Sequence, residues 1–104
     1  MKTAALKPDE LALLRGVFHR HPEVKSVKLF GSRAKGAHAP ASDIDLALWG
    51  EVEALEAEAI AAELDELPMP YKFDVKAFHL IKLQPLCEHI QRAGITVYPA
   101  ALQA

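Results

Sequence analysis

Residues 24–50 read VKSVKLFGSRAKGAHAPASDIDLALWG, and this stretch is the most informative about the fold. Over residues 24–30 successive side chains fall on opposite faces of an extended chain, which predicts a β-strand. Residues 43–49 form a second, apolar strand that ends at Gly50. Residues 33–42 between them are small, polar and basic, and glycine and proline interrupt them, as is typical of a loop. The stretch therefore predicts two strands joined by a basic loop.

The flanking sequence adds helices and two more strands. Leu11, Leu14 and Phe18 recur at helical spacing, which predicts a helix that starts at Pro8 and ends before Pro22. The other expected elements are a helix over 51–67, a strand over 71–78, a helix over 84–93 and a strand over 95–98. The element order is α-β-β-α-β-α-β, in a single domain over 1–104 with its core at about 9–99 and a short frayed C-terminal tail.

Composition restricts the class of protein. The chain has 104 residues, 51% of them hydrophobic and 25% charged, which fits one globular domain and excludes a disordered chain. No apolar run approaches the roughly 20 residues that span a bilayer. A single cysteine, Cys87, allows no internal disulfide, and residues 1–9 lack the apolar core of a signal peptide. We therefore expect a cytoplasmic protein.

The net charge of −2 hides an uneven distribution. Residues 1–38 hold eight Lys or Arg against three Asp or Glu, whereas residues 51–67 hold seven acids and no base. This balance argues against a general nucleic-acid coat and leaves room for a local anion site in the basic third. The acidic segment 51–67 fits a solvated helix face or a docking surface for a basic partner, and the sequence leaves both open.

Gly31 and Ser32 stand where the first strand ends, a place that can bind an anion. Free backbone N–H groups there can bind phosphate oxygens, and glycine lets a phosphate approach the backbone closely. The Ser32 hydroxyl adds one donor, and Arg33 and Lys35 add nearby cations. Taken alone, a Gly-Ser pair more often marks only a turn.

Three carboxylates form the second part of the pattern. Asp43 and Asp45 are two residues apart on a strand, so both project from one face. Asp74 lies on a later strand, where it could join them or merely pair with Lys72 or Lys76 at the surface. Oxygen ligands beside a phosphate loop suit Mg²⁺, and three of them predict a two-metal phosphoryl-transfer site.

The combined pattern resembles the signature of the DNA polymerase β-type nucleotidyltransferase superfamily. Gly31-Ser32, ten residues, then Asp43-Ile44-Asp45-Leu46 is similar to its minimal nucleotidyltransferases, called MNT. The resemblance implies an α+β nucleotidyltransferase (polymerase β-like) fold, a small mixed β-sheet with helices packed on one side. It also implies that Asp43, Asp45 and Asp74 are catalytic residues that bind two Mg²⁺ ions. ATP would be the nucleotide donor.

The same resemblance assigns nucleotide binding to the loop. Gly31 and Ser32 would hold the phosphates, with Arg33 and Lys35 assisting. Lys35 stands where the family usually has a second arginine, so it keeps the charge but loses bidentate geometry.

The short chain resembles the MNT half of HEPN/MNT toxin–antitoxin pairs. The resemblance implies an antitoxin that transfers AMP to a tyrosine of a HEPN toxin, its partner. Two alternatives stay open: a catalytically silent antitoxin that acts by contact, and a transferase that modifies a small molecule. A site completed at an interface, in a homo-oligomer or with the partner, is also expected.

Five histidines invite a metal-site interpretation, but their spacing predicts none. His19 and His21 are two residues apart near a helix end, and His38 lies in the loop. Without a neighbouring cysteine or an i, i+4 pair on a helix, they do not form a zinc motif.

Overall fold

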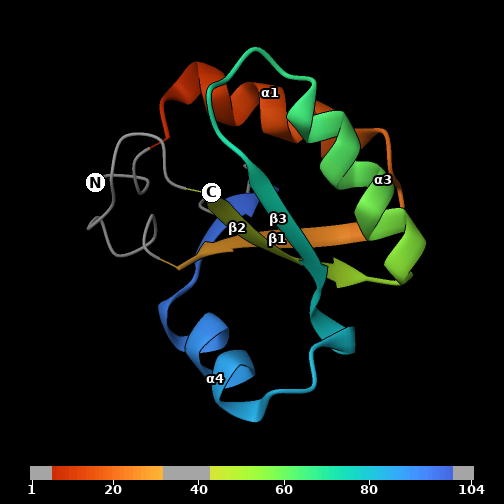
Figure 1. Cartoon of the computed structure of the whole chain (residues 1–104), viewed down its shortest axis with the longest axis vertical. Helices are drawn as coiled ribbons and strands as arrows, with labels where there is room; N and C mark the ends of the chain where they lie inside the picture. The colour runs from red at the N-terminus through yellow and green to blue at the C-terminus, as the bar shows by residue number, and fades with distance from the viewer. Residues whose placement is uncertain (1–5, 32–42, 100–104) are drawn as a thin grey trace.

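The computed structural model describes residues 6–31 and 43–99, and within them the expected order of elements is confirmed (Figure 1). The elements are α1 (Pro8–His19), β1 (Val24–Phe30), β2 (Ile44–Gly50), α3 (Ala54–Asp65), β3 (Phe73–Ala77), the 3₁₀ turn η1 (Phe78–Leu80), α4 (Gln84–Ala93) and β4 (Ile95–Tyr98). Among these helices, none is long and apolar enough to cross a membrane.

Two elements are shorter than the sequence pattern indicates. The helix expected over 51–67 begins only at Ala54, because Val52 is fully buried in the core and Glu53 is extended. It ends at Asp65, since Pro68 disfavours helical angles in the residue before it. The strand expected over 71–78 stops at Ala77, where the chain turns into η1.

The four strands form one mixed sheet in the order β3-β2-β1-β4. Strand β1 is antiparallel to both β2 and β4, whereas β2 and β3 are parallel. A parallel pair needs a crossover connection, and α3 provides it. The mixed sheet agrees with the expected fold.

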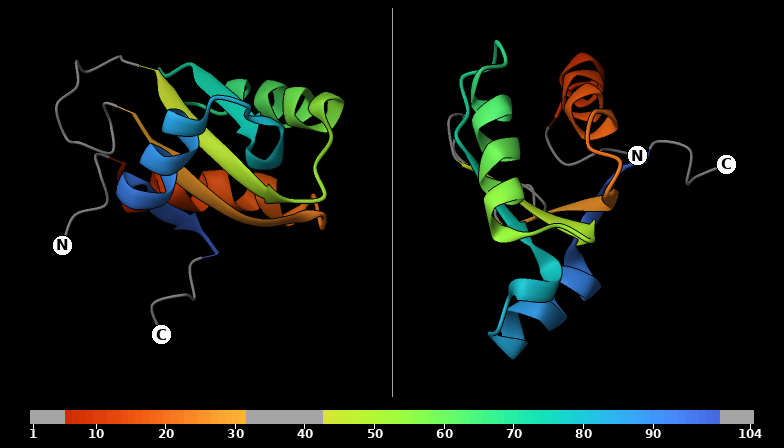
Figure 2. Two further views of the ribbon diagram at one scale, coloured as in Figure 1. Left: turned by 90° about the horizontal axis from the view of Figure 1, so that it is seen from below. Right: turned by 90° about the vertical axis from the view of Figure 1, so that its right-hand side faces the viewer.

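The sheet separates two layers of helix, as Figures 1 and 2 show. Helices α1 and α3 cover one face, where the main core forms around large buried side chains such as Phe18, Leu46 and Ile60. Helix α4 lies against the other face, where Ile90 packs with Phe30 in a smaller cluster. The expectation of helices on one side therefore holds for α1 and α3 and needs correction for α4. Phe30, Ala47 and Trp49 make part of this second face apolar as well, and α4 packs on that part.

Candidate active site

The end of β1 lies directly against β2, the strand that carries Asp45. Gly31 follows Phe30 with a φ of 84°, a conformation that favours glycine. A Cβ added at Gly31 would overlap Oδ2 of Asp45. Glycine is therefore required here for two reasons, backbone conformation and contact with a carboxylate.

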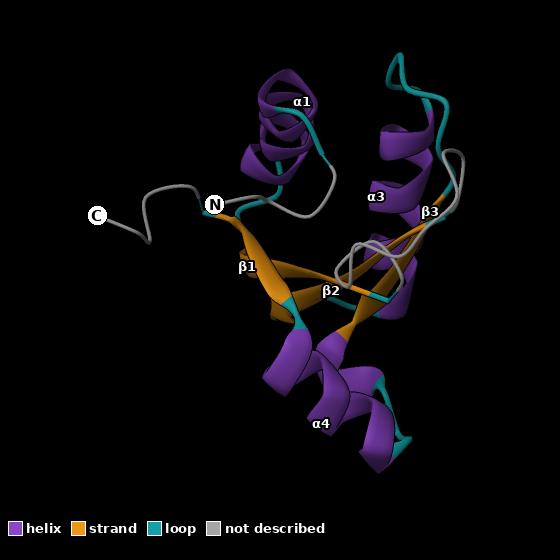
Figure 3. Ribbon diagram, turned by 90° about the vertical axis from the view of Figure 1, so that its left-hand side faces the viewer, coloured by secondary structure: helices purple, strands orange, loops and turns teal. Residues whose placement is uncertain are grey.

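Strand register brings the carboxylates together. Asp45 on β2 is the partner of Asp74 on β3, and in this parallel pair both side chains point to the face that α4 covers. On its other side Asp45 pairs with Phe30 of β1. Asp43 immediately precedes β2 and shares the parity of Asp45. The shared face is confirmed for Asp45 and Asp74, whereas Asp43 lies outside the strand and is placed by parity alone. Figure 3 shows β2 and the helix on this face, α4.

Electrostatics single out Asp45 within the group. Asp43 and Asp74 are exposed, whereas Asp45 is half-buried. Burial raises the pKa of the Asp45 carboxyl, and the charges of Asp74 and then Asp43 raise it further. Lys76 opposes these effects and lowers it. A cation placed among these groups would relieve both the burial cost and the repulsion.

Lys76 is the counter-ion of Asp74. Its Nζ lies 3.2 Å from Oδ2 and 3.3 Å from Oδ1 of that carboxylate. The surface bridge that the sequence left open for Asp74 is thus present, with Lys76 as the partner. Within the described part of the chain, the three aspartates do not offer ligand atoms that all lie within 4.8 Å of one another. Their hard oxygen donors nevertheless suit Mg²⁺, because it binds through few carboxylates and keeps several waters.

Three candidate residues of the nucleotide loop, Ser32, Arg33 and Lys35, lie outside the described residues. The structure therefore brings together Gly31 and the three aspartates, and the other loop positions remain predictions from sequence.

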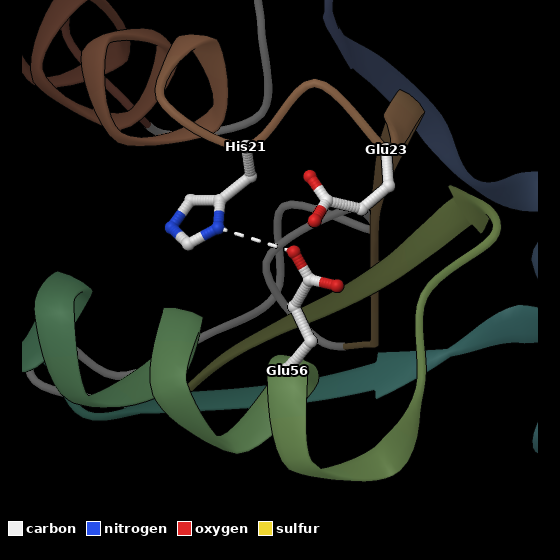
Figure 4. A group of neighbouring side chains, drawn as sticks. All are labelled: His21, Glu23 and Glu56. Carbon is white, nitrogen blue, oxygen red and sulfur yellow. Dashed lines mark hydrogen bonds and ion pairs between the residues drawn. The ribbon is translucent and has the colours of Figure 1, made fainter.

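One group of side chains was not predicted from the sequence. His21, Glu23 and Glu56 come together between the α1–β1 turn and α3, as Figure 4 shows. The spacing of His21 and Glu23 is a weak local signal. Glu56 joins them only through the packing of α3, which no short motif reports.

Comparison with known proteins supplies a family and several similar folds. The family model of polymerase beta nucleotidyltransferases matches residues 13–101. No curated protein matches the sequence. A chain of a toxin–antitoxin crystal structure with AMP-PNP is 19% identical with a TM-score of 0.72, covering 94% of this chain and 77% of that one.

Two further structures are similar. For the toxin–antitoxin MntA-HepT, identity is 15% and the TM-score 0.69, covering 93% of this chain and 76% of that one. For the tri-AMPylated Shewanella oneidensis HEPN toxin with its MNT antitoxin, identity is 16% and the TM-score 0.60, covering 89% of this chain and 76% of that one. At such identities the likeness concerns the fold.

Proposed function

Since the chain belongs to the polymerase β nucleotidyltransferase family, we propose that it transfers AMP from ATP to a tyrosine hydroxyl of a HEPN-type toxin and so acts as its antitoxin. The observation that carries the proposal is the pairing of Asp45 with Asp74, with Gly31 against Asp45. The similar folds support the choice of acceptor, because they include an MNT antitoxin in complex with an AMPylated HEPN toxin.

The residues divide into two roles. Gly31, Ser32, Arg33 and Lys35 bind the phosphates of the nucleotide, the glycine by allowing close approach to the backbone. Asp43, Asp45 and Asp74 would hold two Mg²⁺ ions, and Asp74 would exchange its contact with Lys76 for the metal. Bound Mg²⁺ supplies charge neutralisation at the phosphates and lowers the pKa of the acceptor hydroxyl.

The reaction balances as a single displacement. The tyrosine oxygen forms a bond to the α-phosphorus of ATP while the bond from that phosphorus to the bridging oxygen breaks. Pyrophosphate leaves with the bonding electrons, and the hydroxyl proton passes to the Asp74 carboxylate. The positive charges of Arg33 and Lys35 stabilise negative charge that develops on the departing phosphates.

The test is an intact-mass measurement of the protein encoded next to this chain, after incubation with ATP and Mg²⁺. We expect a gain of one or more AMP units with the unaltered chain and none with the Asp45→Asn/Asp74→Asn variant. Asp65→Asn, an exposed position at the end of α3, is the matched control and should act like the unaltered chain.

Each other outcome rejects part of the proposal. A stable complex without any mass gain would favour an antitoxin that acts by contact alone. If neither an adduct nor a complex forms, the neighbouring protein is rejected as the acceptor. A mass gain that persists in the double variant would remove the aspartates from the mechanism.

A further inference from the structure

A second group of ionisable side chains lies at the other end of β1, away from Gly31. One ring nitrogen of His21 and one carboxylate oxygen each of Glu23 and Glu56 all lie within 4.8 Å of one another (Figure 4). Because a strand advances about 3.3 Å per residue, Glu23 and Gly31 are roughly 25 Å apart. This group is therefore separate from the candidate active site.

The main chain fixes the position of His21 and Glu23. The His21 N–H donates to the Phe18 carbonyl at 2.9 Å, and the Val24 N–H donates to the His21 carbonyl at 2.9 Å. Gly50 packs so closely on this turn that an added Cβ would overlap the Glu23 carbonyl oxygen. Two of the three side chains thus start from a tightly held turn.

Two carboxylates of α3 contact the imidazole of His21. Nδ1 lies 3.2 Å from Oε2 of Glu56, and Nε2 lies 2.9 Å from Oε2 of Glu63. Arg20 in turn donates to Oε1 of Glu63 at 3.1 Å. Histidines that bind metals commonly donate their second ring N–H to a carboxylate, which fixes the tautomer and frees the other nitrogen. Glu63 is placed to accept a hydrogen bond from the Nε2–H group of His21, which leaves Nδ1 free to bind a metal.

Glu23 provides an independent observation. Its Oε1 is buried, and of all side-chain polar atoms buried in the described residues it is the one without a hydrogen-bond partner. A buried carboxylate oxygen without a partner destabilises the fold, and a cation bound between Glu23 and Glu56 would supply that partner.

We propose that His21, Glu23 and Glu56 bind one Zn²⁺ ion, with Glu63 as the hydrogen-bond partner that orients the imidazole. One imidazole nitrogen and two carboxylate oxygens suit zinc, and water completes its coordination. In a tetrahedral zinc site with bonds of about 2.0–2.2 Å, ligand atoms lie about 3.3–3.6 Å apart. The distance of 3.2 Å between His21 Nδ1 and Glu56 Oε2 is close to this range.

A bound ion at this place would tie the α1–β1 turn to α3. Both segments belong to the layer that covers the main core, on the sheet face opposite α4. The ion would therefore act on the stability of the fold, and its binding is independent of the proposed transfer reaction.

The test uses the full-length, tag-free Asp45→Asn/Asp74→Asn protein, so that the candidate magnesium ligands do not bind the probe. Zn²⁺ affinity is measured by competition with a chromophoric chelator, and Co²⁺ is added separately to record its visible absorption. We expect one equivalent of Zn²⁺ to bind and to raise the melting temperature, and Co²⁺ to give an intense tetrahedral-type band.

Variants assign the ligands. In the same background, Glu23→Gln and His21→Asn should each weaken Zn²⁺ binding at least tenfold, and Glu63→Gln about tenfold. The matched controls Glu58→Gln and His19→Asn, at exposed positions of α3 and α1, should bind as the parent does. Circular dichroism verifies that each variant is folded. Equal affinity in the parent and Glu23→Gln, or no Zn²⁺ bound by the folded parent, would overturn the proposal.

Discussion

The two ends of strand β1 each gather carboxylates, but they hold them in different ways. At the end marked by Gly31, neighbouring strands place Asp45 beside Asp74, and Lys76 binds the latter. At the other end, a turn and a helix bring Glu23 and Glu56 around His21. Strand pairing leaves the first group open toward solvent for a reactant. Helix packing buries an oxygen of the second and favours a structural role.

The largest effect is expected when a carboxylate at the Gly31 end of β1 is removed, because this end is assigned to the transfer reaction. Asp74→Asn should reduce the rate of AMP transfer at least about a hundredfold, because metal ligands supply several kcal/mol of transition-state stabilisation and each 1.36 kcal/mol is tenfold in rate. Single-turnover incorporation of labelled AMP measures the effect, with Asp65→Asn as the control. A loss of less than threefold would contradict the assigned role.

A second prediction concerns Gly31 itself. Gly31→Ala should lower stability by about 1–2 kcal/mol, since alanine disfavours a positive φ, and should slow transfer by displacing the Asp45 carboxylate. Gly16→Ala is the control, because a Cβ there meets no atom within 4 Å. In the middle of α1 that change should stabilise the protein by about 0.5–1 kcal/mol. Urea denaturation distinguishes the two outcomes, and equal effects would refute the steric argument.

A third prediction concerns the other end of β1, where His21→Asn is tested with a chelator present to exclude metal. The change removes contacts with two carboxylates and leaves Glu23 beside Glu56 without the imidazole. Since these side chains are partly exposed, we expect a loss of about 1–2 kcal/mol. His19→Asn, two residues earlier and exposed, loses only an edge contact with the Tyr98 ring and should cost less in the same urea titration. Matching losses would show that the carboxylate contacts do not stabilise the fold.

The smallest expected effect is a gain in stability. Because burial and neighbouring charges raise the pKa of Asp45, its ionised form destabilises the metal-free fold above that pKa. Asp45→Asn should therefore raise the melting temperature slightly at neutral pH, and the gain should shrink as pH falls and Asp45 becomes protonated. Added Mg²⁺ should stabilise the unaltered chain more than the variant. A lower melting temperature for the variant at neutral pH would contradict the cause given for the shift.

Sequence patterns predicted the elements that follow from local periodicity. Alternation of side chains located β1 and placed Asp74 opposite the face of Phe73, and Pro8 marked the first helical residue. The common face of the candidate-site carboxylates was predicted for the same reason, since side chains two residues apart in a strand project from one face.

What could not be predicted depends on tertiary packing. The local pattern of residues 84–93 does not indicate which face of the sheet the helix covers. The prediction that α4 lies on the same side as the other helices was therefore wrong. The meeting of His21 with Glu56 likewise depends on how α3 crosses the α1–β1 turn. Lys76 appeared in the sequence as one of two partners for Asp74, and only the structure selects it.

The parallel pairing of β2 with β3 also has a consequence for biosynthesis. Asp74 lies on an edge strand that reaches Asp45 only after the intervening crossover helix has closed against the sheet. Non-local pairing of this kind forms late, because the chain entropy of the loop must be lost first. A nascent or clipped chain that lacks β3 therefore has an incomplete set of carboxylates. Transfer activity would then report that synthesis and folding have passed β3.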